Sequence, residues 1–187
     1  MNRITQLDPA QATGRTKQLF DGIQAKLGLV PNLFRVFGNS TAALESYLNF
    51  SGALASGVLS AQVREQIALA VAEINFCGYC LSAHTYIGGK VGLNDKEIAD
   101  ARHAAAASEK TDAILKLARS IIVQRGEVSD ADFKAARTAG LGDAEIVETV
   151  ANVSLNVLTN YLNHVARTVV DFPEVKPGNG HVVVKGS

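Results

Sequence analysis

The sequence predicts an all-α protein of about nine helices. Alanine is abundant, aromatic residues are few, and tryptophan is absent. Alternation of apolar and polar residues, the pattern of a half-buried strand, is nearly absent, and the one strand-like run, 182–184, lies close to the C-terminus. None of the four prolines falls between residues 32 and 172, so nothing in that stretch forces a helix to break. A chain of 187 residues is long enough to bury a real core.

Capping residues and apolar periodicity set the expected helix boundaries in the first half of the chain. Asp8 followed by Pro9 is a helix-start signal, and Gly28 is a helix-end signal. Ser40 and Ser60 are further N-cap candidates. With the apolar repeat, these residues predict helices over about 9–27, 31–37, 41–56 and 61–74. The last of these has a wide apolar face and is expected to be central.

The second half of the chain is expected to contain five helices. Asn94 and Glu97 form a capping-box pattern, Ser129 is an N-cap candidate, and Asp143 opens the longest apolar stripe. Periodicity extends these signals to helices over about 78–89, 95–107, 113–125, 130–139 and 143–168. We therefore expect residues 1–172 to form a single helical domain.

The last fifteen residues, 173–187, are expected to form a loose tail. Prolines and glycines gather there, at Pro173, Pro177, Gly178 and Gly180. Such residues disfavour both a helix and a central strand.

Residues 91–98 and 139–146 are weakly similar in sequence, which we call the internal echo. Two good helix starts are enough to explain it. A different offset, of 83 residues, pairs Glu65 with Glu148, as a duplicated helical unit whose second copy lost its chemistry would. The same offset pairs Cys80 with Asn163. Both explanations stay open at this point.

Charge and hydropathy exclude several classes of partner. The chain has 18 basic and 18 acidic residues and no basic run longer than a pair, which disfavours nucleic acid. No apolar stretch approaches the length of a membrane span, and the first residues lack the apolar core of a signal peptide. We expect a soluble cytoplasmic protein whose thiols are mostly reduced at rest.

The most informative feature is the pair Cys77 and Cys80, which are the only cysteines, with His84 four residues further on. On a helix, Cys80 and His84 would lie on one face, one turn apart. The dipole at a helix N-terminus would favour a thiolate at Cys77, whereas the imidazole would favour one at Cys80. We favour Cys80 as the nucleophile, because a positioned base also serves later proton transfers. Structural burial and zinc ligation are the alternatives.

A histidine base needs an orienting partner, and two glutamates upstream are candidates. Glu73 is four residues before Cys77, where a bare carboxylate would oppose thiolate formation. Glu65 lies twelve residues before Cys77, which is about 18 Å along a straight helix. Glu65 therefore reaches the site only if the chain breaks and folds back within 75–78, or if a second chain supplies it.

The stretch from Arg64 to His84 resembles the signature of the alkylhydroperoxidase D family, within the carboxymuconolactone decarboxylase superfamily. The family pattern is a glutamate, eleven residues, Cys-x-x-Cys, three residues and a histidine, and every spacing is met. The resemblance implies an all-helical fold that assembles into trimers or hexamers. It also implies that Cys80 is the peroxidatic cysteine and Cys77 the resolving one, with Glu65 and His84 as a proton relay.

The resemblance extends from about Leu29 to Pro173. The downstream stretch 160–164 is similar to the branch called peroxidase-related proteins, and its Asn160 and His164 share a helix face that could line a pocket or an interface. One position departs from the pattern, because Tyr79 stands where well-studied peroxidase members often have a histidine. A phenol titrates near pH 10 and cannot act as a base at neutral pH.

These observations predict a dithiol hydroperoxide reductase that needs no metal or organic cofactor. Its expected partners are a small hydroperoxide and a dithiol or lipoylated-protein reductant. The alternatives are a non-redox enzyme of the carboxymuconolactone decarboxylase type, and a metal-binding or non-catalytic oligomeric protein.

Overall fold

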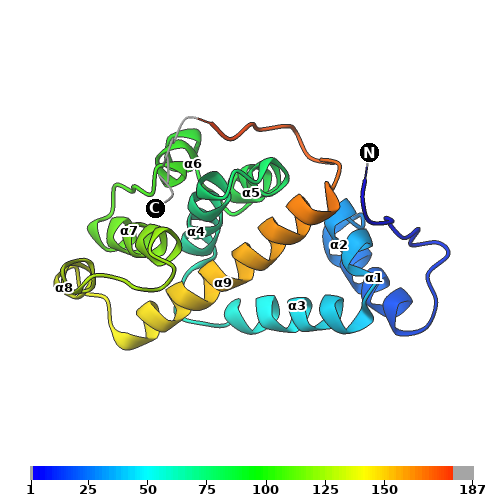
Figure 1. Cartoon of the computed structure of the whole chain (residues 1–187), viewed down its shortest axis with the longest axis horizontal. Coiled ribbons are helices and arrows are strands. Elements are labelled where there is room, and N and C mark those ends of the chain that lie inside the picture. Colours follow the sequence, from blue (N-terminus) through cyan, green and yellow to red (C-terminus); the bar gives the residue numbers. More distant parts are fainter. Residues whose placement is uncertain (1, 179–187) are drawn as a thin grey trace.

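The computed structural model describes residues 2–178, and these residues form nine helices and no strand. The helices are α1 (Gly14–Leu27), α2 (Asn32–Phe37), α3 (Thr41–Leu54), α4 (Ala61–Ile74), α5 (Gly78–Lys90), α6 (Asp95–Arg102), α7 (Glu109–Val123), α8 (Asp130–Thr138) and α9 (Asp143–Ala166). This confirms the all-α prediction (Figure 1). The strand-like run 182–184 lies outside the described residues.

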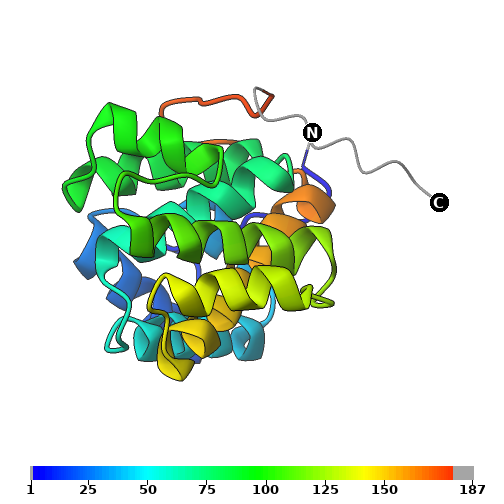
Figure 2. The same cartoon turned by 90° about the vertical axis from the view of Figure 1, so that its left-hand side faces the viewer.

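Helix α4 is the centre of the fold, as its wide apolar face predicts. Every residue from Gln66 to Glu73 is buried, and α4 packs against α5, α6, α7 and α9. The long helix α9 crosses the molecule, with α4, α5 and α7 on one side and α3 on the other (Figures 1 and 2). The carboxyl-terminal half of α9 therefore lies beside the start of α5, where the two cysteines are.

Most predicted caps form. Ser40, Ser60 and Ser129 each accept a hydrogen bond from the backbone N–H three residues on. At the start of α6, the Asn94 side chain accepts from the Glu97 N–H while the Glu97 carboxylate accepts from the Asn94 N–H. These bonds satisfy N–H groups that a helix start leaves without a partner.

Three helix boundaries differ from the prediction. The first helix begins at Gly14, because the Asp8 carboxylate accepts from the Ala10 N–H and closes a local turn instead of capping a helix. Helix α6 ends at Arg102 because Ala104 has a left-handed backbone, with φ 55°. Helix α7 begins at Glu109, one turn earlier than its apolar residues indicate.

The chain breaks between α4 and α5, inside the predicted segment 75–78. Phe76 has a left-handed backbone, with φ 54°, and the Cys77 N–H donates to the Ala72 carbonyl across 2.9 Å. This bond closes the end of α4 and turns α5 back against it. Fold-back within one chain is therefore the way in which Glu65 approaches the cysteine motif.

The internal echo reflects two similar helix starts. The Glu145 carboxylate accepts from the Gly142 N–H across 2.8 Å, as Glu97 does for Asn94. Helix α9 is continuous over 24 residues and has no break equivalent to the one between α4 and α5. The second half of the chain therefore lacks the helix–break–helix arrangement that a second copy would have.

The chain after α9 is irregular but attached, which corrects the expectation of looseness for residues 173–178. The Val175 N–H donates to Ser82 Oγ across 2.9 Å, and the Gly178 N–H donates to Glu73 Oε1 across 2.9 Å. Arg102 also donates to the Lys176 carbonyl. Both views place this segment along the side formed by α5 and α6 (Figures 1 and 2).

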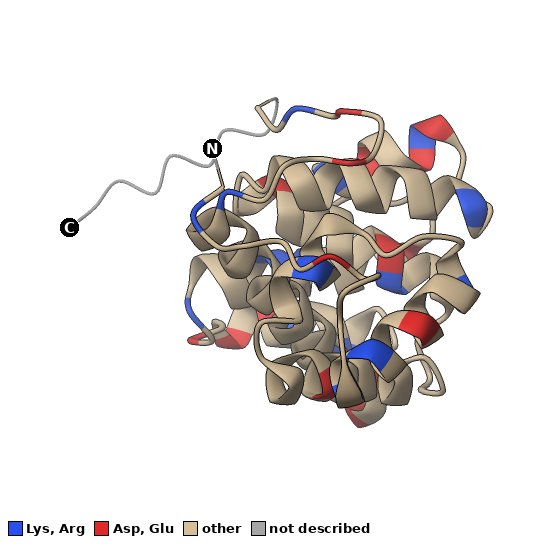
Figure 3. Ribbon diagram, turned by 90° about the vertical axis from the view of Figure 1, so that its right-hand side faces the viewer, with Lys and Arg blue, Asp and Glu red and all other residues tan. Residues whose placement is uncertain are grey.

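The two signs of charge are interspersed on the side shown in Figure 3. No basic run or single-sign stripe gathers there, as the sequence composition predicts. Within residues 2–178, no helix is both long enough and apolar enough to cross a membrane.

Candidate functional site

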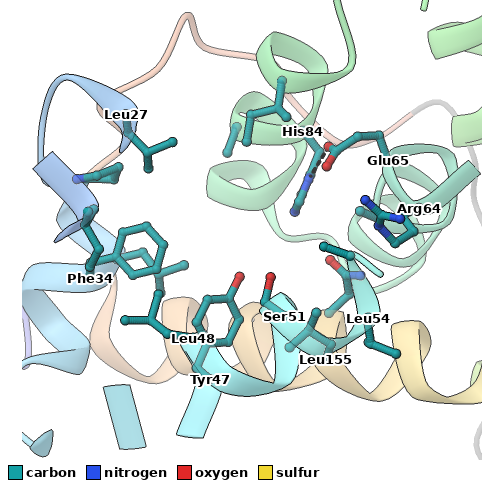
Figure 4. Close-up of a pocket in the computed structure, with 18 of the residues that line it drawn as sticks. Leu27, Phe34, Tyr47, Leu48, Ser51, Leu54, Arg64, Glu65, His84 and Leu155 are labelled. Atoms are coloured by element: carbon teal, nitrogen blue, oxygen red, sulfur yellow. Dashed lines mark hydrogen bonds and ion pairs between the residues drawn. The ribbon is translucent and has the colours of Figure 1, made fainter. Parts of the chain in front are cut away.

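The break after α4 brings Glu65 and His84 into direct contact. His84 Nδ1 and Glu65 Oε2 are 2.7 Å apart (Figure 4). Both side chains are largely buried, with 20% of the His84 surface and 17% of the Glu65 surface exposed. The carboxylate therefore fixes the ring orientation of His84, whose other nitrogen is left to face a reacting group.

The two cysteines lie at the start of α5, and both are free thiols. Cys77 is the N-cap of the helix, and its Sγ accepts from the Cys80 N–H across 3.3 Å. Cys80 lies one turn before His84 on the same helix. Both cysteines are almost completely buried, with 1% and 2% exposure.

The surroundings favour the thiolate at Cys80. Burial opposes the charged form, but the Cys77 thiol, the charge of His84 and the Asn163 amide together lower the Cys80 pKa from 9.0 to about 7. The pKa of Cys77 is raised, because its thiol donates to Cys80 and because it is buried. For His84, burial lowers the pKa, but the Glu65 carboxylate outweighs it and the net direction is upward. The arrangement can therefore hold a Cys80 thiolate beside a protonated His84.

Helix α9 contributes the residue that sequence reasoning did not assign to the site. Asn163 Nδ2 donates to Cys80 Sγ across 3.2 Å. The helix-break residue Asn75 donates to Asn160 Oδ1 across 3.0 Å, and its carbonyl lies 2.8 Å from His164 Nε2. Asn160 and His164 therefore hold the break between α4 and α5 in place and do not line the cavity.

Glu73, the other candidate carboxylate, is not part of the relay. Its Oε2 is 2.8 Å from Arg102 Nε, and only 2% of its side chain is exposed. This ion pair removes the bare negative charge that would oppose a thiolate at Cys77. With the Gly178 bond, Glu73 joins α4, α6 and the chain after α9.

Tyr79, the position out of the family pattern, lines the same cavity as the proton relay, but its hydroxyl binds the backbone of α2. Its hydroxyl accepts from the Leu33 N–H across 3.1 Å, and its ring makes an edge contact with Phe172 at 5.8 Å between centroids. Burial raises its pKa, with Asp171 acting in the same direction. Tyr79 therefore stays a neutral phenol and packs α5 against α2 and the chain after α9.

A cavity of about 300 Å³ opens onto the Glu65–His84 pair. Its wall is mainly apolar, and Figure 4 shows among others Leu27, Phe34, Leu48, Leu54 and Leu155. Polar side chains gather at one end, namely Tyr47, Ser51, Arg64, Glu65 and His84. Cys80 is not part of the wall, whereas His84, one helical turn further along α5, is.

Tyr47 lines this cavity, and the sequence did not predict a role for it. Its ring stacks on Phe37 at 5.2 Å and lies 5.8 Å from the ring of Phe34. Figure 4 shows its hydroxyl pointing into the cavity beside Ser51. Burial, with the charges of Glu65 and Cys80, raises its pKa, so the phenol keeps its proton.

No group of three or more histidine, cysteine or acidic side chains is placed to hold a metal ion in residues 2–178. The site itself combines a buried dithiol with a carboxylate-oriented imidazole. The four residues named from the sequence, Glu65, Cys77, Cys80 and His84, all lie at this one place.

Comparisons with known proteins agree with the geometry. The profile of the carboxymuconolactone decarboxylase family matches residues 41–123. A solved peroxidase-related protein from Ralstonia eutropha JMP134, described as having an alkylhydroperoxidase AhpD core, is 25% identical, with 91% of this chain and 92% of that chain covered and a TM-score of 0.79. No curated protein matches the chain.

Two further solved structures share the fold. A peroxidase-related protein from Silicibacter sp. TM1040 is 24% identical, with coverage of 89% and 92% and a TM-score of 0.77. The debrominase Bmp8, solved in its apo form, is 16% identical, with coverage of 90% and 92% and a TM-score of 0.77. Residues 41–123, which contain the Glu65–His84 motif, thus match the carboxymuconolactone decarboxylase family, and the chain has the fold of alkylhydroperoxidase D-like, peroxidase-related proteins.

Proposed function

We propose that the protein is a dithiol hydroperoxide reductase. One observation carries the proposal: a carboxylate-oriented imidazole, Glu65–His84, lies one turn from a thiol of lowered pKa, Cys80, whose backbone N–H donates to the sulfur of the second thiol, Cys77. A reactive thiolate, a proton carrier and a resolving thiol are the parts that such a reaction needs. The family match and the peroxidase-related solved structures support the same class.

In the first step, the Cys80 thiolate attacks the terminal oxygen of the hydroperoxide. An S–O bond forms as the O–O bond breaks, and the alkoxide leaves with the electron pair of that bond. The protonated His84 gives the alkoxide a proton, so the products are an alcohol and a Cys80 sulfenic acid. Glu65 keeps the charged imidazole in place during the transfer.

In the second step, the Cys77 thiol attacks the sulfur of the sulfenic acid. The S–S bond forms, the hydroxyl group leaves, and the thiol proton converts it to water. The raised pKa of Cys77 comes first from its hydrogen bond to Cys80. Oxidation of Cys80 removes that bond, so Cys77 becomes easier to deprotonate at the moment it must react. A dithiol or a lipoylated protein would then reduce the disulfide and complete the cycle.

The hydroperoxide would enter through the cavity that ends at Glu65 and His84. The apolar wall suits a hydroperoxide that carries an organic group. Because His84 lines the cavity and Cys80 does not, we expect the hydroperoxide to pass the imidazole on its way to the sulfur, and the imidazole is also the group that must protonate the product.

Assembly into homo-trimers or homo-hexamers and the nature of the reductant stay predictions of the family resemblance. The non-redox decarboxylase alternative predicts normal activity without either thiol. The metal-binding alternative predicts bound metal in protein purified without chelator. Both alternatives can thus be tested on the same preparation.

The test of the proposal is a thiol count on reduced protein before and after one equivalent of an organic hydroperoxide such as cumene hydroperoxide. We expect two thiols per chain to disappear, with a Cys77–Cys80 disulfide in the peptide map. The Cys80→Ser variant is the control and should consume no hydroperoxide. Two thiols left in the wild type, or wild-type turnover by Cys80→Ser, would contradict the proposal.

A further inference from the structure

Four asparagines lie on one buried face of α9. They are spaced by three or four residues, as one face of a helix requires, and each is almost completely buried. They are Asn152, Asn156, Asn160 and Asn163. Buried amides are unfavourable unless each N–H and C=O finds a partner, so such a row calls for an explanation.

The first two asparagines are satisfied within their own helix. Asn152 Nδ2 donates to the Glu148 carbonyl, and Asn156 Nδ2 donates to the Asn152 carbonyl, each across 2.8 Å. These bonds follow the helix backbone and involve no residue of the thiol site. Asn152 and Asn156 are therefore explained by local structure.

The last two asparagines make no such bond and turn toward the start of α5. Asn163 Nδ2 donates to Cys80 Sγ across 3.2 Å. Asn160 Oδ1 accepts from Asn75, which fixes the amide plane, and its Nδ2 has no hydrogen-bond partner although it is fully buried. The Asn163 amide, through its direct bond, and the nearby Asn160 amide both lower the pKa of the Cys80 thiol.

A donor left without a partner beside a neutral thiol is unfavourable, because a thiol is a weak acceptor. The same donor is satisfied when the sulfur is charged, since a charged acceptor makes the stronger bond. The contrast between the two halves of the row therefore points to the ionised state of Cys80 as the state for which Asn160 and Asn163 are placed.

We propose that Asn163 and Asn160, from α9, form an amide donor pair that stabilises the Cys80 thiolate. The inference rests on the proposed function only in taking Cys80 as the reactive thiol. Asn163 contacts the sulfur directly, while Asn160 is held toward it by Asn75, so we expect Asn163 to have the larger effect.

The test measures the ionisation of Cys80 and needs no peroxide. The ultraviolet absorbance of the thiolate is titrated in reduced protein, with Cys80→Ser as the baseline. The Asn163→Leu variant removes the donor at similar volume. Loss of a hydrogen bond to a charged group should raise the Cys80 pKa by about one to two units.

The matched control is Thr159→Val. Thr159 is buried on the same helix, and its hydroxyl donates to the Asn156 carbonyl across 3.0 Å, away from the thiols. We expect this variant to leave the Cys80 pKa unchanged even if it lowers the melting temperature. A pKa that is unchanged in folded Asn163→Leu, or one that shifts equally in both variants, would overturn the inference.

A second measurement covers the case in which Asn163→Leu does not fold. In wild-type protein, the side-chain amide NMR signals of Asn163 and Asn160 should titrate with the Cys80 midpoint, and this titration should vanish in Cys80→Ser. Side-chain amide signals whose chemical shifts do not change as Cys80 titrates would refute the donor pair. Because neither measurement uses hydroperoxide, failure of the peroxidase proposal and failure of this inference are separate results.

Discussion

Cys77 and Cys80 lie three residues apart at one helix start and are almost equally buried, yet their surroundings act on them in opposite directions. Burial alone would keep both as neutral thiols. The Cys77 thiol, the charge of His84 and the amides of α9 favour the thiolate of Cys80, and the Cys80 pKa falls to about 7. The Cys77 thiol donates a hydrogen bond to Cys80, and the pKa of Cys77 rises. The difference comes from the side chains around each sulfur, not from depth in the protein.

The helix dipole and the neighbouring side chains favour a thiolate at different cysteines. Cys77 is the N-cap of α5, the position where a helix dipole acts most strongly on an anion. The Cys77 sulfur accepts a hydrogen bond from the Cys80 backbone N–H. The stronger thiolate site is nevertheless one turn into the helix, because the His84 charge and the direct bond from Asn163 act on Cys80.

The largest expected effect comes from replacing either cysteine with serine. Cys80→Ser should lower hydroperoxide consumption by roughly a thousandfold or more, because it removes the attacking atom. Cys77→Ser should still consume one equivalent per chain and then stop at a sulfenic acid, which dimedone labelling and mass spectrometry detect. If Cys77→Ser were the inactive variant and Cys80→Ser formed the sulfenic acid, the two roles would be reversed.

The relay should show the next largest effect. His84→Gln removes the proton carrier, and we expect oxidation of Cys80 to slow about a hundredfold. Glu65→Gln keeps the ring but removes the charge that raises the His84 pKa, so the loss should be nearer tenfold, as expected for a partner that acts through the base. Stopped-flow rates with excess hydroperoxide measure both.

The pH dependence of Glu65→Gln separates a role in the relay from a role in packing. Its activity should begin to fall at a lower pH on the alkaline side than that of the wild type, because His84 loses its proton earlier. A lower rate with an unmoved pH profile would mean that Glu65 only supports the structure.

Much of this site was readable from the sequence because its residues lie close together in the chain. The spacing of Cys77, Cys80 and His84 needs only helix geometry, and the distance from Glu65 required a break that the structure places at Phe76. Asn163 was not assigned, because its contact with Cys80 depends on how α9 packs across α5. The regular spacing of the asparagines along α9 was the available signal.

The fold was predicted best where a cap is local and worst where a local bond competes with the helix. Ser40 and Asn94 cap as expected. Asp8 carries the same signal but closes a turn instead. The chain beyond Pro173 looked loose from its composition, whereas Ser82 and Glu73 bind its backbone. Those partners lie far away in sequence, and no local pattern reports them.

The pH profile of wild-type oxidation tests the lowered Cys80 pKa directly. The thiolate is the deprotonated form, so the rate should rise with pH through a midpoint near 7 and fall about tenfold for each unit well below it. On the alkaline side, loss of the His84 proton should lower the rate again. Single-turnover rates across the neutral range, at constant ionic strength, give the profile. A midpoint near the ordinary thiol value of 9.0 would remove the electrostatic difference between the two cysteines.

The smallest effect on catalysis is expected at Tyr79, which lies between the two cysteines in sequence but serves neither sulfur. Tyr79→Phe removes the acceptor for the buried Leu33 N–H, and we expect a loss of about 1–3 kcal/mol in the free energy of unfolding, measured with urea. The rate of Cys80 oxidation should stay close to that of the wild type, since the hydroxyl binds the Leu33 N–H and Glu65 binds His84. Tyr79→His would restore the family residue, but it would also lose the ring contact with Phe172, so we expect lower stability without a gain in rate. A Tyr79→Phe rate as low as that of Glu65→Gln would instead make the phenol a member of the relay, and the contrast between Cys77 and Cys80 would then depend on a donor from within the motif itself.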